Sequence, residues 1–184
     1  MDEVYEEAQS MMKSALESLK KEFAGVRTGR ATTALLDGVM VDYLGTQTQL
    51  RQLASLSVPE SRLIVVQPWD KTVVGEVEKA IQRSNLGLNP VSDGKVIRVP
   101  IPPLTEERRK DLVKVVKKSA EDRRVSIRNA RRDGNELLKQ LEKEKEISKD
   151  DARRGQERIQ KLTDQFIKEL DEIAAQKEKE VMEE

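Results

Sequence analysis

The sequence lacks histidine and cysteine entirely, and its 184 residues include only one Trp, two Tyr and two Phe. Without His or Cys, the usual zinc sites, cysteine nucleophiles, Ser-His-Asp triads and histidine general bases are excluded. Neither GxxxxGKS nor GxxxxGKT occurs, which excludes hydrolysis of ATP or GTP at a P-loop. We therefore expect a protein that is not an enzyme and that has no metal site and no cofactor.

Long apolar runs are also lacking. No stretch of about 18 apolar residues occurs, so no membrane-spanning helix is expected. Residues 1–4 are acidic at two positions and lack the basic, then apolar plan of a signal peptide. The absence of Cys excludes disulfides and permits a reducing compartment. We expect a cytoplasmic protein without membrane contacts.

The chain is instead rich in charge, and three segments show helical periodicity. Charged residues make up 37% and hydrophobic residues 36%, which suits long amphipathic helices. Apolar residues recur at three- and four-residue steps, as on one face of a helix. The expected inward residues are Val4, Ala8, Met11, Ala15, Leu16, Leu19, Phe23 and Val26; then Leu112, Val116, Ala120, Ile127, Ala130, Leu137 and Leu141; then Ile159, Leu162, Phe166, Leu170 and Ile173.

The ends of the two later helices carry capping signals. Thr105 is the expected N-cap of a helix that continues to about residue 144, with acidic residues in its first turn. Some 40 residues give a helix about 60 Å long. Ser148 followed by Asp151 resembles a capping box at the start of the next helix.

Residues of roughly 31–103 have a different character. Short β-rich runs at 39–41, 55–58, 63–66 and 96–99 are separated by Gly and Pro, and one helix fits 72–84. This predicts a small α/β module of about 70 residues. Trp69, in a turn after Pro68, is expected to pack within that module.

Three helices that each bury one face favour a three-helix bundle with the α/β module inserted into it. The expected fold is α+β: a discontinuous bundle of residues 1–29 and 105–184, and an inserted domain of residues 30–104. Two chain crossings join them, one with glycine and one with prolines, which is typical of a hinge with restricted directions. The two crossings are residues 27–30, going out to the inserted domain, and residues 100–104, coming back.

Positive charge is concentrated in one segment although the net charge is zero. Residues 108–132 contain eleven basic and three acidic residues, a net charge of +8. Six of these bases follow helical steps of 4, 3, 7, 4 and 3 and share one face, which we call the cationic stripe. Its members are Lys110, Lys114, Lys117, Arg124, Arg128 and Arg131, with Arg132 at the edge. We expect the stripe to face solvent, opposite the bundle core.

Helical charges usually form i,i+4 ion pairs on a solvated face. Here the segment contains too few acidic residues to pair its bases, which favours an anionic partner. The arginines of this segment are suited to binding phosphate groups. The scarcity of aromatic residues argues against recognition of single strands by base stacking. Recognition of the shape and phosphates of folded RNA fits best. The alternative is a helical adaptor that binds an acidic protein partner.

Several longer motifs are specific enough to indicate a family. In order along the chain they are VRTGRA (26–31), LLDG (35–38), EKAI (78–81), LGLNP (86–90), IRVP (97–100), PPLTEERRKDL (102–112), VSIRNARRD (125–133), EKEIS (144–148) and QKLTD (160–164). Together they cover essentially the whole chain, which resembles bacterial ribosome recycling factor. One departure is Gly134, where the family often has Ala; glycine there costs about 1 kcal/mol of helix propensity and leaves room for a local bend.

This resemblance implies an L-shaped, roughly tRNA-sized monomer whose three-helix bundle is hinged to a β/α/β domain. It implies that the protein binds the 70S ribosome and its 50S subunit after termination, through 23S rRNA. It also implies that elongation factor G, by hydrolysing GTP, splits the subunits with its help, and that initiation factor three then keeps them apart. The motif match makes Arg109, Arg128 and Arg131 the principal candidate rRNA contacts, with Arg132, Arg27 and Arg30 as adjacent candidates. It also implies a hinge at Gly29, Arg30, Pro103, Leu104 and Thr105, to which Thr28 and Pro102 are adjacent.

Overall fold

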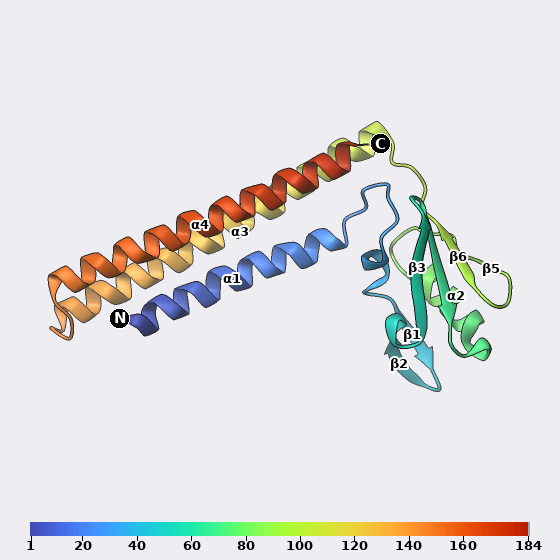
Figure 1. The fold of residues 1–184 in the computed structure, drawn as a ribbon, viewed down its shortest axis with the longest axis horizontal. Helices are drawn as coiled ribbons and strands as arrows, with labels where there is room; N and C mark the ends of the chain where they lie inside the picture. The colour runs from blue at the N-terminus through green and yellow to red at the C-terminus, as the bar shows by residue number, and fades with distance from the viewer. Residues whose placement is uncertain (184) are drawn as a thin grey trace. The chain divides into compact units, whose positions relative to one another are not determined.

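The computed structural model describes residues 1–183 and divides into two compact units (Figure 1). The first consists of Met1–Phe23 and Lys110–Glu183, and the second of Ala24–Arg109. Both chain crossings, residues 24–30 and 100–105, therefore fall within the second unit. Helices and strands are both present, which confirms the expected α+β class.

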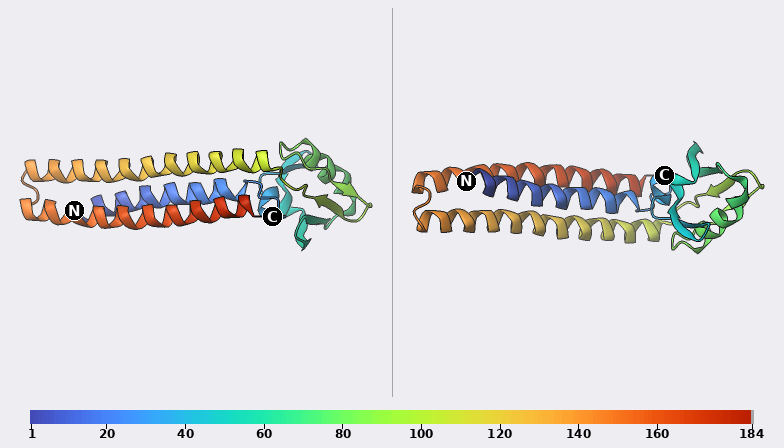
Figure 2. Two further views of the ribbon diagram at one scale, coloured as in Figure 1. Left: turned by 90° about the horizontal axis from the view of Figure 1, so that it is seen from above. Right: turned by 90° about the horizontal axis from the view of Figure 1, so that it is seen from below.

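Three long helices form the first unit: α1 (Asp2–Ala24), α3 (Glu106–Lys143) and α4 (Lys149–Met182). They lie side by side along their lengths in both views of Figure 2. The 38 residues of α3 correspond to about 57 Å of unbroken helix. Each helix buries one stripe of residues against the other two.

Both expected caps are confirmed. The Thr105 hydroxyl accepts a hydrogen bond from the Arg108 amide (3.2 Å). Ser148 and Asp151 form a full capping box at the start of α4, with each side chain bonded to the other residue's backbone. Between α3 and α4, Lys145 adopts a positive φ of 62°, the left-handed conformation common just after helix C-termini.

The bundle core differs from the expected one at two positions. Met12 is fully buried and Met11 is exposed, and likewise Leu138 is buried and Leu137 exposed. Both expected residues were wrong, because in each case two apolar residues are adjacent and the helical period fits either one. The other expected inward residues are buried or half-buried.

Glycine allows close packing between the helices. A Cβ added at Gly134 would lie 2.9 Å from Ile159 Cδ1 and 3.7 Å from Ala8 Cβ. A Cβ at Gly155 would lie 2.8 Å from Leu138 Cδ1. α3 continues without interruption through Gly134, and the missing side chain makes room for the neighbouring helices.

The second unit contains a four-stranded antiparallel sheet of order β3-β4-β6-β5, with a separate β1–β2 hairpin. The strands are β1 (Met40–Tyr43), β2 (Thr46–Gln49), β3 (Ala54–Glu60), β4 (Leu63–Pro68), β5 (Val91–Ser92) and β6 (Ile97–Pro100). The helix α2 (Val74–Arg83) follows a short 3₁₀ turn at Lys71–Val73, and two further 3₁₀ turns lie at Thr33–Leu36 and Leu50–Gln52. β2 was not expected, because its sequence TQTQ contains no apolar residue.

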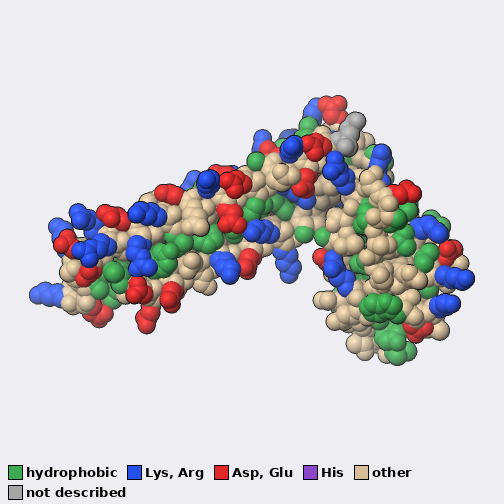
Figure 3. Space-filling model, in the orientation of Figure 1, with side chains coloured by type: hydrophobic (Ala, Val, Ile, Leu, Met, Phe, Trp, Pro, Cys, Tyr) green, Lys and Arg blue, Asp and Glu red, His purple; other side chains and the backbone are tan. Residues whose placement is uncertain are grey.

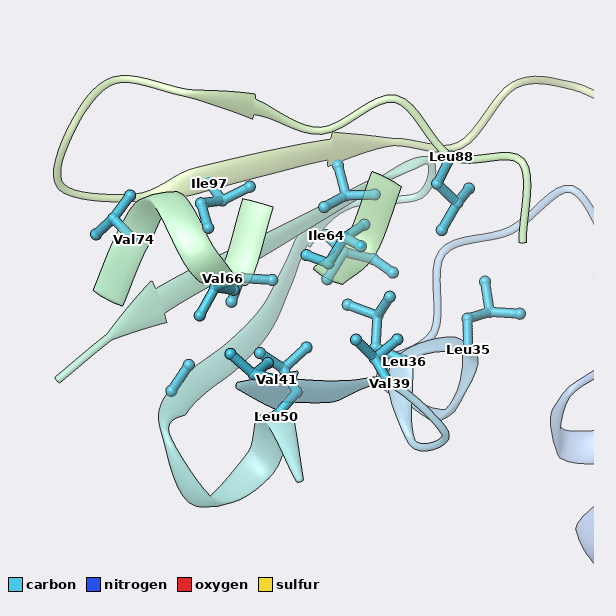
Figure 4. Packing of buried hydrophobic residues seen from close by; sticks show 14 of the residues in the cluster. Leu35, Leu36, Val39, Val41, Leu50, Ile64, Val66, Val74, Leu88 and Ile97 are labelled. Carbon is cyan, nitrogen blue, oxygen red and sulfur yellow. The ribbon is translucent and has the colours of Figure 1, made fainter. Parts of the chain in front are cut away.

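The hydrophobic cluster of this unit consists of aliphatic residues alone. Ile64, Val66 and Ile97 from the sheet meet Val41 and Leu50 from the hairpin region (Figure 4), with Val77 and Ile81 from α2 completing the layer. The hairpin and α2 thus cover one face of the sheet. Trp69 does not take part: it is 67% exposed, so the expectation that it packs within the module was wrong.

Candidate nucleic-acid interface

The cationic stripe follows α3, but it does not face solvent uniformly. Lys110, Lys114, Lys117 and Arg128 are exposed, as is Arg132 at its edge, whereas Arg124 and Arg131 are half-buried. On the one face of the bundle that Figure 3 shows, basic and acidic side chains are interspersed. The expectation that the whole stripe lies opposite the core is therefore corrected.

Arg124 is bound on two sides by carboxylates. Its Nε donates to Asp171 Oδ1 on α4 (2.8 Å) and its Nη1 donates to Glu121 Oε2 (3.0 Å), with the side chain 25% exposed. Partial burial acts to lower the pKa of Arg124, but the bonds to Asp171 and Glu121 outweigh it and raise the pKa. Arg124 therefore connects α3 to α4, and the ion-pair interpretation of helical charge is correct at this position.

Arg131 makes a similar contact further along α3. Its Nη1 donates to Gln160 Oε1 on α4 (3.2 Å), which leaves the remaining guanidinium donors available. Arg124 precedes Arg131 by seven residues, or about two helical turns, so the two side chains extend from the same side of α3. Because both contact α4, this side is the edge of α3 nearest α4. The sequence could not show that this edge is the one covered by α4.

Acidic residues on other helices also neutralise part of the segment. Arg123 Nη2 donates to Glu22 Oε2 on α1 (2.8 Å), and Ser119 Oγ donates to Glu22 Oε1 (2.6 Å). Within residues 108–132 alone, the acidic residues are too few to pair the basic ones. Asp171 and Glu22, far away in the sequence, supply the missing carboxylates, and no local signal identifies them.

Two exposed members of the stripe, Lys114 and Arg128, are only loosely paired. Lys114 lies 3.7 Å from Asp111 and Arg128 lies 3.6 Å from Glu121, in pairs that are half or more exposed. Exposed pairs of this kind contribute little and are easily exchanged for other anions. Among residues 1–183, Lys117 and Arg132 have no ion-pair partner. This row of cations can neutralise phosphates on an external surface.

The two chain crossings contact each other within the second unit. Gly29 has a φ of +79°, and a Cβ there would lie 3.8 Å from Leu104. Arg27 Nη2 lies 3.4 Å from the Pro102 carbonyl oxygen, while its Nε is buried without a partner. Arg109 Nε lies 3.5 Å from the Leu104 carbonyl oxygen. The side chain of Arg27 is thus half-buried against the returning crossing.

The remaining expected hinge and contact residues have varied environments. Thr28 is buried, Arg30, Pro102, Pro103 and Thr105 are exposed, and Leu104 is half-buried. Across residues 1–183, no helix is long and apolar enough to cross a membrane, and no three carboxylates are grouped as metal ligands.

Comparison with known proteins adds a decisive observation. Residues 19–182 match the profile of the family described as ribosome recycling factor. The chain belongs to the ribosome recycling factor family. Among its relatives, the ribosome-recycling factor of Solidesulfovibrio magneticus is 59% identical over all of both chains. That of Carboxydothermus hydrogenoformans is 56% identical over 99% of this chain and 98% of the relative.

Solved structures of ribosome recycling factors share the fold. One, determined in solution, has a TM-score of 0.81 at 46% identity and covers 98% of this chain and 96% of its own. Another is a Thermus thermophilus ribosome recycling factor described with Escherichia coli elongation factor G, bound to the E. coli post-termination complex. It has a TM-score of 0.69 at 47% identity over 99% and 98% of the chains. The function of this chain is ribosome recycling.

Proposed function

We propose that this chain binds 23S rRNA of the 50S subunit, within the 70S ribosome left after termination, through the exposed cations of α3. The observation that carries the proposal is the exposed row on one helix side: Lys110, Lys114, Lys117, Arg128 and Arg132. Arg109 and Arg131 lie on the same helix and complete the proposed contact. Rows of cations on a rigid helix neutralise phosphates whose positions are fixed by folded RNA.

Three other arginines have different proposed parts in this contact. Arg30 is exposed and remains a candidate for rRNA contact. We assign Arg124 to holding α3 against α4, since both of its faces are occupied by carboxylates. Arg27 is assigned to holding the two crossings together, because its guanidinium already lies against Pro102.

Splitting of the ribosome requires energy that this chain does not supply. We propose that elongation factor G provides it by hydrolysing GTP, and the relative described with that factor on a post-termination complex supports this. Initiation factor three then keeps the subunits apart. The chain acts as a monomer in the cytoplasm, without a cofactor and without catalysing a reaction itself.

The two crossings are the proposed hinge between residues 30–104 and the bundle formed by residues 1–29 and 105–184. Gly29 takes up a positive φ that other residues rarely adopt, and Pro102 and Pro103 lack an amide donor and keep their φ fixed. Thr28, Arg30, Leu104 and Thr105 complete it. A joint with one permissive and one stiff crossing permits motion in few directions.

Co-sedimentation with purified large subunits at low and moderate salt tests the rRNA contact. We expect Lys117→Ala with Arg128→Ala to weaken binding and to reduce the steepness of log K against log salt by about 0.7–0.9 for each phosphate that is no longer neutralised. The matched control is Lys161→Ala with Lys168→Ala, which removes the same charge from the exposed side of α4. An equal loss of affinity in the control would contradict a specific contact on α3.

The second candidate is a helical adaptor that binds an acidic protein, because the same exposed cations would suit carboxylates. Treatment of the isolated complex with RNase distinguishes the two. Release of the chain by RNase supports rRNA contact, and retention of the chain on a protein supports the adaptor.

A further inference from the structure

Arg124 and Arg131 both reach from α3 to the neighbouring α4, which lies beside α3 in both views of Figure 2, but their partners differ in charge. Arg124 meets carboxylates on two sides. Arg131 donates instead to an uncharged group, the side-chain amide of Gln160 (Nη1 to Oε1, 3.2 Å), and within residues 1–183 it forms no ion pair. A neutral acceptor can fix the direction of a guanidinium without cancelling its charge.

The amide of Gln160 is itself held in one orientation. Its Nε2 donates to Asp164 Oδ1, one turn further along α4 (2.8 Å), while its Oε1 accepts from Arg131. Because a guanidinium has only donors and a carboxylate only acceptors, an amide between them can satisfy both in one orientation alone. Asp164 therefore acts on Arg131 through the amide, and among the described residues no ion pair joins the two.

A hydrogen bond from Gln to an acidic residue four positions later also has a purely local effect, since such pairs slightly stabilise a helix. A second pair of this kind on α4 joins Gln176 Nε2 to Glu180 Oε1 (3.3 Å). In the part of the chain that the structure describes, the Gln176 oxygen bonds to no arginine. Local stabilisation therefore explains the bond within each pair, but it does not explain the contact of Gln160 with Arg131.

We propose that Gln160 is a positioning residue for the rRNA contact: together with Asp164 it holds the Arg131 guanidinium in the direction in which it meets a phosphate, and it leaves the charge uncancelled. The inference rests on the proposed function, in which Arg131 contacts rRNA. Nε and Nη2 of Arg131 form no hydrogen bond within residues 1–183, so these donors remain for a phosphate. Orienting the side chain before binding reduces the entropy that binding costs.

Removal of the acceptor tests the positioning role. Gln160→Met keeps a side chain of similar length and helix propensity but cannot accept the bond from Arg131. In co-sedimentation with purified large subunits, we expect an affinity about threefold lower, the loss of one hydrogen bond of modest net strength, with an unchanged dependence on salt. Gln176→Met is the matched control, because it breaks the same kind of pair away from Arg131, and it should bind as the unaltered chain. Equal losses in the two variants would overturn the proposal.

A double-mutant cycle shows whether Gln160 acts through Arg131. In an Arg131→Ala background, Gln160→Met should cause no further loss of affinity, because the group that Gln160 positions is absent. The same loss in both backgrounds would overturn the proposal.

A change of charge at Gln160 tests why the partner is neutral. Gln160→Glu keeps an oxygen that can accept from Arg131 but pairs the guanidinium with a negative charge. The slope of log K against log salt should then become less steep by about 0.7–0.9, as for one phosphate that is no longer neutralised. An unchanged slope would show that neutrality of the partner is irrelevant and would overturn the proposal.

The second readout uses the full chain without ribosomes. NMR relaxation of the Arg131 Nε–H group reports how freely the guanidinium moves on the ps–ns timescale. We expect its order parameter to fall in Gln160→Met and to stay the same in Gln176→Met, with equal thermal midpoints in both variants and the unaltered chain. An unchanged order parameter in Gln160→Met would overturn the proposal.

The two readouts also separate this inference from the proposed function. If Arg131→Ala leaves the affinity for large subunits unchanged, the rRNA contact at Arg131 is wrong and the inference falls with it. If Arg131→Ala weakens binding but Gln160→Met does not, the contact stands and the positioning role is overturned.

Discussion

The two units of this chain are stabilised in different ways. Sixteen buried residues, all of them aliphatic, form one contiguous cluster in the second unit. The bundle also buries an apolar stripe from each helix, but it adds small residues at helix contacts and polar bonds between helices, such as those of Arg124 with Asp171 and of Arg158 with Asp2. Long helices expose most of their surface, so charged side chains near a seam can reach across it while their ends stay hydrated.

This difference means that the same kind of residue has different effects in the two units. Charge near a bundle seam contributes to stability and is then less available for binding, as at Arg124. In the second unit the buried cluster contains no charged residue. The stability of each unit can be measured separately by amide hydrogen exchange, because exchange reports the local unfolding of individual segments.

The largest effect is expected from a cavity in the aliphatic core. Ile64 is fully buried in the central strand β4, and Ile64→Ala should lower the free energy of unfolding of the second unit by about 4 kcal/mol. Exchange should accelerate for β3, β4 and β6. Unchanged protection in those strands would contradict the single-cluster description.

Overpacking the bundle should have a somewhat smaller effect. Gly155→Leu places atoms where Leu138 already lies and should cost about 3 kcal/mol, seen as faster exchange in α3 and α4. Gly75 in α2 is the matched control, because nothing lies within 4 Å of an added Cβ. Gly75→Leu should stabilise its unit by up to about 1 kcal/mol through helix propensity. Equal destabilisation at both positions would show that close packing at Gly155 is not the cause.

Removing a cation where α3 meets α4 should have a smaller effect on stability than either of these changes. Arg124→Ala removes two bonds between partly exposed groups and should lower bundle stability by about 1 kcal/mol. Large-subunit binding at moderate salt should fall less than for Lys117→Ala, because Arg124 is already engaged. If co-sedimentation shows a larger loss of binding for Arg124→Ala than for Lys117→Ala, Arg124 belongs to the rRNA contact.

The smallest effect concerns pH. Backbone hydrogen bonds from Val96 and Lys95 lower the pKa of Asp93 to about 2, with Arg98 also contributing. A carboxyl with a lowered folded pKa stabilises above its unfolded pKa of about 3.9, and this contribution is lost as pH falls toward 2. Denaturant midpoints of the second unit should therefore fall between about pH 4 and pH 2, and Asp93→Asn should flatten that dependence. An identical slope in the variant would exclude Asp93 as a source.

Local signals in the sequence were sufficient where structure is local. Ser148 and Asp151 are three residues apart and bond to each other, so the start of α4 could be predicted from their spacing alone. Helical periodicity similarly identified three helices, but it could not decide between Met11 and Met12, since both are apolar and adjacent. That choice depends on how the helix is rotated against its neighbours.

The candidate site was predictable only in part for the same reason. Spacing placed six cations on one side of α3, yet which of them meet solvent depends on where α4 lies. Gln160 and Asp171 belong to a distant segment, so their bonds to Arg131 and Arg124 are tertiary effects.

The cross-helix bonds also have a mechanical consequence for α3. Glu22 and Asp171 tie it to α1 and α4 near one level, and Gln160 ties it to α4 two turns further along. A helix that is bonded to its neighbours at two levels resists rotation about either level. Over its length of about 57 Å, a tilt of about 0.1 radian would displace one end by about 6 Å. A force on one end of α3 therefore moves the other end instead of bending the helix.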